Sequence, residues 1–342
     1  MVHATWLNEA IGSLVACQDM QTYMVDTSEL LAMATATYRV KPTLTESTRQ
    51  AQTLLFPLLV NQNHWVLAIM QRSGRFMAPP DLYDSLPAAT TVPGVQDTLR
   101  AFCRHYMPQE LNNVDYLVEC GTPLQQNGVD CGVFAFASCI HALIGRPLPV
   151  RLSMPIWRRA LATVVGVEEV DWTSLVPGLP QTTTLAADAD AVPTPSTGNP
   201  LQMYSNILNT AKARFNALKS RLAQELDQAI QLTSSTLGDV VAAHRIFQSL
   251  ETMSAHKAAV LQQQLHEATT MGSLVVQGTK SPHHAAQGQI QRSYESVERA
   301  RVRLMTITQR LRELNTTLQG QKQDLLSERK AFEQREVEAQ GS

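Results

Sequence analysis

The chain has 342 residues, enough for about two domains, with 44% apolar residues, 17% charged residues and a formal net charge of -2. This composition is globular and excludes a wholly disordered chain, and the overall charge gives no indication of a nucleic-acid partner. The two halves differ, because residues 1–199 hold 11 basic and 17 acidic residues whereas residues 200–342 hold 17 and 13. All four tryptophans and all five cysteines lie in the first half, so we expect the aromatic core there.

The first half alternates between helical and strand-like patterns. Leu7, Ile11 and Leu14 stand at helical spacing, and residues 6–51 are predicted to be mostly helical. Apolar runs then predict two strands at 54–60 and 65–70, a turn at 71–74, and a returning strand at 76–86. We therefore expect a hairpin in this region.

Further elements follow towards residue 167. The pattern predicts helices at 95–106, 131–144 and 156–167, with a short strand at 115–119. The middle helix is a continuous apolar run that Gly145 and Pro147 should end, so we expect it to be buried.

Residues 168–200 are rich in Pro, Thr, Ala and Asp and predict a linker with little surface to bury. Beyond them, one apolar stripe recurs at seven-residue intervals and predicts a coiled coil: Ile290, Val297, Leu304, Leu311, Leu318, Leu325 and Phe332. An earlier stripe predicts a second long helix from about residue 200: Leu201, Leu208, Phe215 and Leu222, with Tyr204, Ala211 and Leu218 three residues on. Gly278, Pro282 and Gly288 are expected to break the helix between them. An antiparallel hairpin or a dimer would bury both stripes.

The cysteine pattern and the N-terminus indicate the cellular setting. Five cysteines at irregular spacing, with no Cys-x-x-Cys pair, predict reduced thiols instead of disulfides or a zinc site. The segment MVHATWLNEAIG lacks the pattern of a secretory signal, and the uncharged stretch 50–71 holds Pro57 and several amides that exclude a membrane-spanning helix. We expect a soluble intracellular protein of the nucleus, the cytoplasm or both.

Cys131 is the candidate nucleophile. The segment GTPLQQNGVDCGVFAF, residues 121–136, places it where a polar loop enters the apolar helix. At a helix N-terminus, free N–H groups and the positive end of the dipole favour a thiolate. Gly132 allows a substrate backbone to approach closely. The alternative interpretation is a small buried residue at a helix start.

A nucleophilic cysteine needs a base within hydrogen-bond reach and a group that orients the base. His64 precedes a predicted strand, and Asp84 ends the strand that pairs back with it, so the hairpin would bring the two together. Asp81 begins the same strand and is the weaker candidate. Taken singly, His64 fits an ordinary half-buried histidine and Asp84 fits a turn residue.

Acyl chemistry also requires donors for the developing oxyanion. The side-chain amide of Gln125, six residues before Cys131, is the candidate donor beside the Cys131 backbone N–H. Gln126 is the adjacent competitor, and the alternative is a merely polar loop. The remaining cysteines have no base nearby in sequence and are predicted to be structural: Cys17, Cys103, Cys120 and Cys139.

These residues resemble the catalytic domain of the ubiquitin-like-protein-specific cysteine proteases, which include the SUMO proteases and are related to the adenovirus-type proteases. The similarity rests on four elements: Trp6-Leu7-Asn8-Glu9, His64-Trp65, Tyr83-Asp84-Ser85, and Gln125 followed after five residues by Cys131-Gly132. It covers about residues 1–167. It implies an α+β, papain-like cysteine peptidase fold with a central mixed or antiparallel sheet, here followed by an all-α coiled-coil region.

The resemblance also implies roles. Cys131 would be the nucleophile, His64 the general base and acid, Asp84 the orienting carboxylate, and Gln125 the oxyanion donor. Trp65 would help wall a narrow tunnel for a Gly-Gly tail, and Gly132 would lie against the substrate. No metal or cofactor is implied.

We therefore predict a cysteine peptidase or isopeptidase that processes or removes a SUMO-like modifier after its C-terminal Gly-Gly. The predicted organisation is a catalytic domain at 1–167, a linker at 168–200 and a helical coiled-coil region at 201–340. Two alternatives remain, namely an inactive modifier-binding module with a coiled-coil scaffold and an acyltransferase with the same Cys, His and acid.

The expected partners are the ubiquitin-like modifier and its conjugates, with self-association or a partner helix along residues 290–332. Basic residues after 200 are interleaved with Glu, which indicates a solvated helix face and neither a nucleic-acid nor a membrane partner. Because the linker offers little burial, we expect the catalytic half to work without the helices.

Overall fold

The computed structural model describes residues 4–18, 21–33, 35, 37–88, 91–178, 200–274 and 282–341. Contacts divide the chain into two compact units. The first unites residues 1–171 with 243–310, and the second unites 172–242 with 311–342. Both long C-terminal helices therefore contribute to both units.

A mixed sheet forms the centre of the first unit. Its six strands are β1 Thr22–Met24, β2 Thr53–Val60, β3 His64–Ser73, β4 Phe76–Met77, β5 Asp81–Tyr83 and β6 Val118–Cys120. They follow the order β1-β2-β3-β5-β6, with β4 pairing to β3. β3 is antiparallel to both β2 and β5, whereas the β1–β2 and β5–β6 pairs are parallel. The predicted mixed sheet is confirmed.

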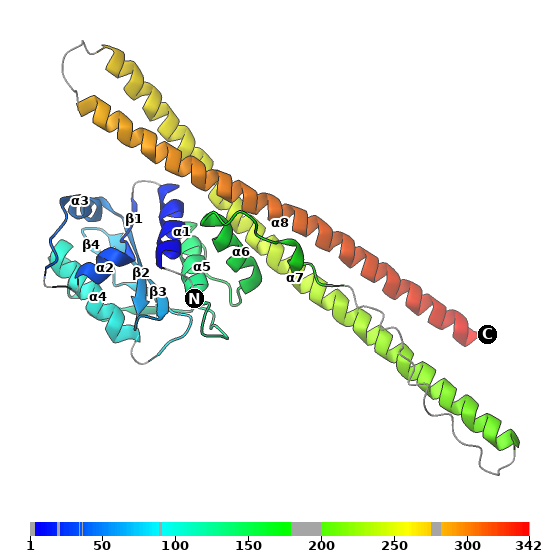
Figure 1. The fold of residues 1–342 in the computed structure, drawn as a ribbon. Coiled ribbons are helices and arrows are strands. Elements are labelled where there is room, and N and C mark those ends of the chain that lie inside the picture. The colour runs from blue at the N-terminus through cyan, green and yellow to red at the C-terminus, as the bar shows by residue number, and fades with distance from the viewer. Residues whose placement is uncertain are drawn as a thin grey trace. The chain divides into compact units, whose positions relative to one another are not determined.

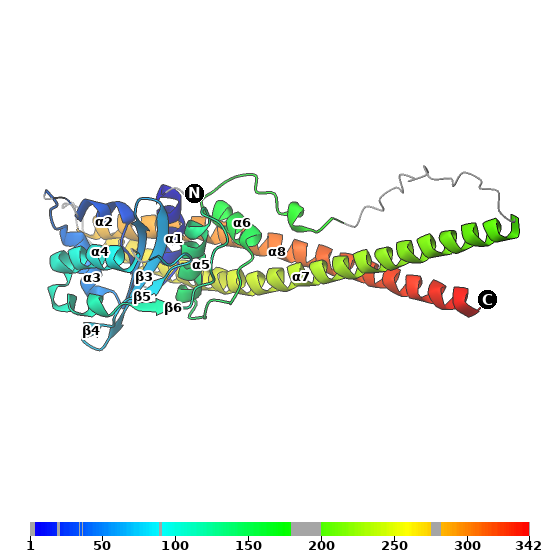
Figure 2. The same ribbon diagram turned by 90° about the horizontal axis from the view of Figure 1, so that it is seen from below.

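Helices cover both faces of the sheet (Figures 1 and 2). One face carries α2 Thr27–Met33, α3 Pro42–Gln50 and α4 Thr91–Tyr106, and the other carries α1 Ala4–Ala16, α5 Cys131–Leu143 and α6 Met154–Val164. On β2, Leu54 and Phe56 join the core under α4, while Leu55 between them is also fully buried. Burial on both faces explains why the strand sequences are continuously apolar.

Three short elements differ from the sequence prediction. β1 lies inside the region predicted as helical, and three residues at a sheet edge give too short a pattern to recognise. The strand predicted at 76–86 is interrupted between β4 and β5, where Pro79 and Pro80 have no N–H to donate to a ladder. The strand predicted at 115–119 is a 3-10 helix at Asn113–Tyr116 followed by β6.

The C-terminal half forms two long helices, α7 Pro200–Leu274 and α8 Pro282–Gly341. α8 begins at Pro282, which agrees with the predicted interruption at this residue, and proline is tolerated where the first N–H groups lack intrahelical partners. Gly288 lies within α8 and does not break it. Gly278 lies outside the described residues.

The predicted apolar stripe of α8 is buried. Its central members are at most 1% exposed: Val297, Leu304, Leu311, Leu318 and Leu325. The earlier stripe on α7 differs, because its side chains are 42% to 71% exposed: Tyr204, Leu208, Phe215, Leu218 and Leu222. The side chain of Leu201 lies outside the described residues. Helix formation is therefore as predicted at both stripes, while burial is as predicted at one.

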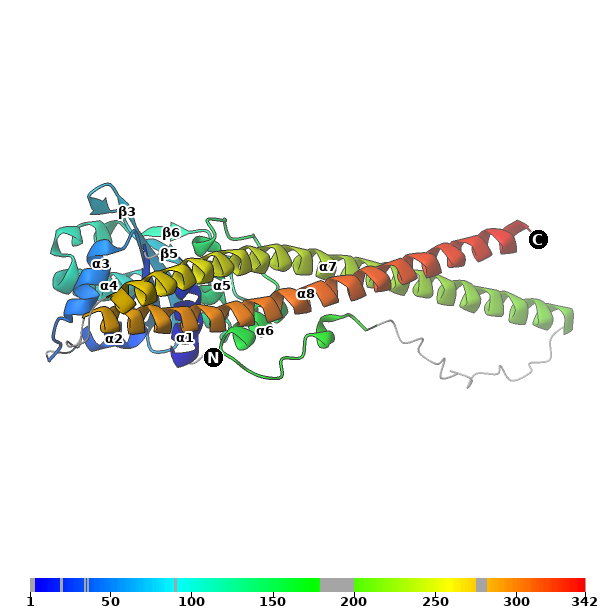
Figure 3. The ribbon, with the colours of Figure 1, turned by 90° about the horizontal axis from the view of Figure 1, so that it is seen from above.

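Within the first unit, parts of α7 and α8 pack against α1 and α6 (Figures 1 and 3). The rings of Phe247 on α7 and Trp157 on α6 lie 5.5 Å apart. Cys17, just beyond α1, shares an apolar cluster with two residues of each long helix: Ala258, Leu261, Val297 and Ala300. The first half of the chain therefore packs against segments of both long helices, and its ability to work without them stays a prediction.

The end of α6 receives a polar contact from α8. Arg303 Nη1 donates to the Val164 carbonyl at 2.6 Å and lies 3.4 Å from a carboxylate oxygen of Glu9 on α1. Gly166 follows with a φ of 86°, and a Cβ at this position would lie 2.8 Å from Arg303 Nη2. Glycine therefore meets two requirements there, a left-handed backbone and space for the guanidinium.

The second unit contains the remaining parts of α7 and α8. Arg329 Nε donates to Asp227 at 2.8 Å, and Lys219 pairs with Glu336 at 2.8 Å, so the pairs join α7 to α8. Residues 172–178, predicted as the start of the linker, include the 3-10 helix Thr173–Leu175 and the buried Trp172. Among the described residues, no helix is both long and apolar enough to cross a membrane.

Candidate active site

A tight turn places His64 at the first position of β3. Asn61 and Gln62 have positive φ values of 52° and 61°, which fit a hairpin turn between antiparallel strands. Val60 at the end of β2 then pairs with His64. His64 is thus placed by a rigid strand pair.

Asp84 follows β5 directly and meets His64 through the pairing of β3 with β5. His64 Nε2 lies 2.7 Å from Asp84 Oδ1, which also accepts the Leu86 N–H at 2.8 Å. Asp84 is 8% exposed, so water competes little for these contacts. Asp81 lies at the other end of β5 beside Cys120, where burial raises the pKa of its carboxyl group. The choice of Asp84 over Asp81 agrees with this geometry.

Cys131 is the first residue of α5 and is 1% exposed. Burial raises the pKa of its thiol, but the hydrogen bond with His64 and the backbone N–H groups of Trp65 and Gly132 outweigh burial and lower the pKa overall. The position favours a thiolate by the combination of imidazole and helix N–H groups.

The pKa of the His64 imidazole is shifted in the opposite direction. The Asp84 hydrogen bond, followed by the Cys131 contact, raises the pKa of His64 to about 9 against the opposing effect of burial. Since Nε2 faces Asp84, Nδ1 is the ring nitrogen available to the thiol. The lowered pKa of Cys131 and the raised pKa of His64 both favour a thiolate–imidazolium pair.

The remaining four cysteines lack this environment. Burial raises the pKa of Cys17 and Cys103 to about 12, and it also raises the pKa values of Cys139 and Cys120. All five cysteines are free thiols. The lowered thiol pKa thus distinguishes Cys131 from every other cysteine of the chain.

Gln125 is held by two hydrogen bonds with Ser85. The Gln125 N–H donates to the Ser85 carbonyl at 2.8 Å, and Ser85 Oγ donates to Gln125 Oε1 at 2.9 Å. Because Ser85 occupies the amide oxygen, the amide NH₂ group remains to donate elsewhere. Gln125 is buried, whereas Gln126 is exposed. The geometry favours Gln125 of the two candidates.

The two predicted substrate-binding residues lie directly beside the thiol. Trp65 follows His64 on β3 and is 2% exposed, and Gly132 is buried in the first turn of α5. Both place their backbone N–H groups against the Cys131 sulfur. Their roles in substrate binding stay predictions.

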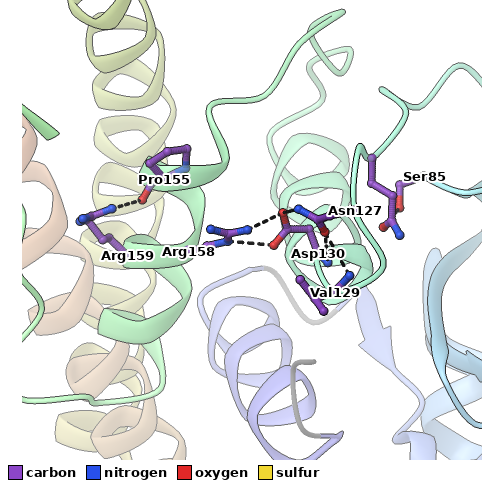
Figure 4. Close-up of polar contacts among 8 residues, drawn as sticks. Ser85, Asn127, Val129, Asp130, Pro155, Arg158 and Arg159 are labelled. Carbon is purple, nitrogen blue, oxygen red and sulfur yellow. Dashed lines mark hydrogen bonds and ion pairs between the residues drawn. The ribbon is translucent and has the colours of Figure 1, made fainter. Parts of the chain in front are cut away.

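A polar cluster behind Cys131 was not predicted (Figure 4). Arg158 of α6 donates from Nε to Asp130 Oδ1 at 2.8 Å and from Nη2 to Oδ2 at 2.7 Å. Asn127 Nδ2 donates to Asp130 Oδ2 at 2.7 Å, while Asn127 Oδ1 accepts the N–H groups of Val129 and Asp130. The motif marks Asn127 and Asp130, but nothing in the sequence pattern distinguishes Arg158 from its neighbour Arg159.

Within the described ranges, no three His, Cys, Asp or Glu side chains come together in a way that could hold a metal ion. The groups that the site brings together are a thiol, an imidazole, a carboxylate and amide donors.

Residues 8–150 match the family described as the Ulp1 protease family, C-terminal catalytic domain. The match covers less than half of the chain and contains His64, Asp84, Gln125 and Cys131. No curated protein sequence matches the chain.

Several solved structures are similar to part of the chain. SUMO protease Ulp1, with its catalytic cysteine oxidised to a sulfonic acid, has 17% identity and a TM-score of 0.37, covering 48% of this chain and 77% of that one. The Xanthomonas campestris effector XopD bound to ubiquitin has 14% identity and a TM-score of 0.37, covering 47% and 89%. The Ulp1-like SUMO protease catalytic domain of Chaetomium thermophilum has 18% identity and a TM-score of 0.33, covering 46% and 70%. The match of residues 8–150 to the Ulp1 protease family confirms the resemblance predicted from the motifs.

Proposed function

We propose that this chain is a cysteine peptidase that hydrolyses the bond after the C-terminal Gly-Gly of a SUMO-like modifier. One observation carries the proposal: Cys131 contacts His64, and the other ring nitrogen of His64 lies 2.7 Å from the buried Asp84 carboxylate. A nucleophile, a base and a group that orients the base are thus adjacent, as nucleophilic catalysis requires.

The chemistry follows from the two shifted pKa values. The Cys131 thiolate attacks the carbonyl carbon of the terminal glycine, and the resulting oxyanion accepts hydrogen bonds from the Cys131 N–H and the Gln125 amide. His64 gives its proton to the leaving amine, which departs and leaves a thioester. His64 then takes a proton from water, the hydroxide attacks the thioester, and the modifier leaves with a free carboxylate while the thiol is restored.

The burial of the site supports a glycine-rich substrate. Cys131 and Trp65 are 1% and 2% exposed, so an extended chain can reach the sulfur only through a narrow path. Glycine has no side chain and adopts backbone conformations closed to other residues. These features support a Gly-Gly tail as the proposed ligand beside Trp65 and Gly132, and the modifier and its conjugates are the proposed partners.

The remaining predictions extend the proposal. The five free thiols fit a reducing compartment, and we propose the nucleus or the cytoplasm as the location. For α7 and α8 we propose a coiled coil, supported by the buried seven-residue stripe of α8 and the Arg329–Asp227 pair between the two helices.

C-terminal electrophilic probes of ubiquitin and of several SUMO-like modifiers test the proposal directly. The full chain should form a covalent adduct with at least one modifier probe and cleave a matching fusion, and Cys131→Ala should abolish both. Cys139→Ala is the matched control on the same helix, and it should retain labelling. Modifier binding without an adduct would instead support the inactive binding module, and acetyl transfer from acetyl-CoA without hydrolysis would support an acyltransferase.

A further inference from the structure

Asp130 occupies the N-cap position of α5 but does not cap the helix. Aspartate is among the preferred N-cap residues because its carboxylate accepts N–H groups of the first turn. Here its side chain makes no cap hydrogen bond. Only its backbone carbonyl serves the helix, accepting the N–H groups of Val133 and Phe134 at 2.8 and 3.0 Å.

Both carboxylate oxygens of Asp130 are held elsewhere. Arg158 forms a two-bond contact at 2.8 and 2.7 Å, and Asn127 supplies a third bond to Oδ2 at 2.7 Å (Figure 4). Asp130 is 3% exposed, so the carboxylate lies in a poorly solvated place where an ionic partner matters most. The contact turns the carboxylate towards α6 and away from the first turn of α5.

We propose that Arg158 is a positioning residue that holds the Asp130 carboxylate off the N-terminus of α5 and so reserves the first-turn N–H groups for the Cys131 thiolate. Two effects follow if Arg158 is lost. The carboxylate then keeps only the Asn127 bond and can rotate into the ordinary cap position, where it competes with the thiolate for the Gly132 N–H. It also brings an uncompensated negative charge next to the sulfur, which disfavours a second negative charge.

The other charged groups around Cys131 do not perform this function. His64 on β3 contacts the sulfur itself, and Asp84 after β5 is bonded to His64. Glu9 is on α1, which packs against α5, and its carboxylate lies 3.4 Å from Arg303. Of these, Arg158 on α6 is the cation that neutralises Asp130.

Thiol alkylation tests the proposal without requiring a peptidase substrate. Iodoacetamide forms an S–C bond with the Cys131 thiolate and releases iodide, and mass analysis of the peptide containing Cys131 gives the rate against pH. Four variants of the full chain are compared with the unaltered protein: Arg158→Met, Asp130→Ala, Arg158→Met with Asp130→Ala, and Arg158→Lys. Arg159→Met is the matched control, because Arg159 donates to the backbone carbonyls of Pro155 and Asp171.

The expected pattern is asymmetric. Arg158→Met should slow alkylation at about pH 6 by about tenfold or more, since one unit of thiol pKa changes the thiolate fraction tenfold. Asp130→Ala and the double variant should both stay within about threefold of the unaltered chain, because the competing carboxylate is absent. Arg158→Lys keeps the charge but loses the two-bond geometry and should fall between.

A merely structural ion pair predicts a different result. In that case Asp130→Ala would slow alkylation as much as Arg158→Met, and the double variant would be no faster than either. Either finding overturns the proposal. Should Arg158→Met fail to fold by circular dichroism, the Asp130→Ala, Arg158→Lys and double variants still decide it.

This inference rests on the proposed function only for its effect on turnover. If the chain cleaves no modifier while the alkylation pattern holds, the peptidase proposal fails and the positioning role stands. If turnover is present and the alkylation pattern is symmetric, the positioning role fails alone. In an active enzyme, kcat should drop with Arg158→Met and recover in the double variant.

Discussion

The candidate catalytic cluster and the exposed stripe of α7 were both predicted from short sequence patterns, and their surroundings in the structure differ. His64, Asp84, Gln125 and Cys131 each have a polar partner that accounts for their position. In α7, Leu208 and Phe215 repeat at the predicted spacing yet are 55% and 66% exposed.

The difference lies in what a pattern specifies. Polar partners must match in chemistry and geometry. A histidine, a carboxylate and a thiol on elements that meet in space therefore identify one another as partners. A seven-residue apolar repeat defines a helix and one face of it, but not the surface that covers this face. Sequence patterns are therefore more informative about the cluster than about the partner of a stripe.

Removal of the Asp84 charge should have the largest effect. Asp84→Asn keeps the shape but loses the carboxylate that chiefly raises the pKa of His64, so kcat/KM should fall by roughly 10⁴-fold, as for other catalytic carboxylates that orient a histidine. The sign of the pH effect follows. In the unaltered chain the His64 imidazolium persists to about pH 9. Without the Asp84 carboxylate the pKa of His64 falls towards the ordinary 6.5, so the alkaline limb of the pH–rate profile should move to lower pH. Asp81→Asn is the control, and an unmoved alkaline limb in Asp84→Asn would contradict the assignment.

Loss of a ring at the contact between α6 and α7 should destabilise the first unit. Phe247 is fully buried against Trp157, and Phe247→Ala should reduce the free energy of unfolding by about 3 to 5 kcal/mol. Chemical denaturation of the full chain measures this loss. Leu232→Ala, on the same helix at 57% exposure, should cost less than about 0.5 kcal/mol. Equal effects would mean that the helix contact contributes nothing to the stability of the catalytic half.

The assignment of the oxyanion donor distinguishes Gln125 from the adjacent Gln126. Gln125→Ala should lower kcat by about 100- to 1,000-fold, equivalent to about 2.7 to 4 kcal/mol, with little change in KM. Gln126→Ala should be nearly silent because that side chain is exposed. Ser85→Ala removes the bond to Gln125 Oε1 and should produce an intermediate loss. A sensitive Gln126 would show that the oxyanion donor is one residue away from the predicted position.

The smallest effect is expected on the exposed stripe. Phe215→Ala should change the free energy of unfolding by less than about 0.5 kcal/mol at low protein concentration, since little burial is lost. Leu318→Ala, on the buried stripe of α8, should cost about 2 to 5 kcal/mol by the same measurement. A large, concentration-dependent loss in Phe215→Ala, checked by light scattering, would show that self-association covers the stripe.

Much of the fold could be predicted because its strands and buried helix have strong patterns. The β2–β3 hairpin and α5 appear close to their predicted bounds, since continuous apolar runs bounded by turns leave few alternatives. The three-residue β1 could not be predicted, because its strand character depends on pairing with β2. The break predicted at Gly288 is wrong, since a glycine is compatible with a long helix whose stability comes from packing.

The site was predictable where its residues lie within one motif and not where they meet only in space. Gln125 and Cys131 are separated by five residues, and His64 and Asp84 belong to paired strands. Arg158 meets Asp130 from 28 residues away, through the packing of α6 on α5. Without the fold, it is one of two adjacent arginines.

Gly166 is a position at which an added side chain would clash with a neighbouring helix. An added methyl group would meet the Arg303 guanidinium at 2.8 Å and would also strain a backbone with a φ of 86°. Gly166→Ala should therefore loosen the contact of α8 with the end of α6 while leaving the apolar cluster around Cys17 and the pairing of Phe247 with Trp157 chemically intact. A single added carbon atom at Gly166 can thus weaken the polar contact between α8 and the end of α6 without changing either of the two apolar contacts.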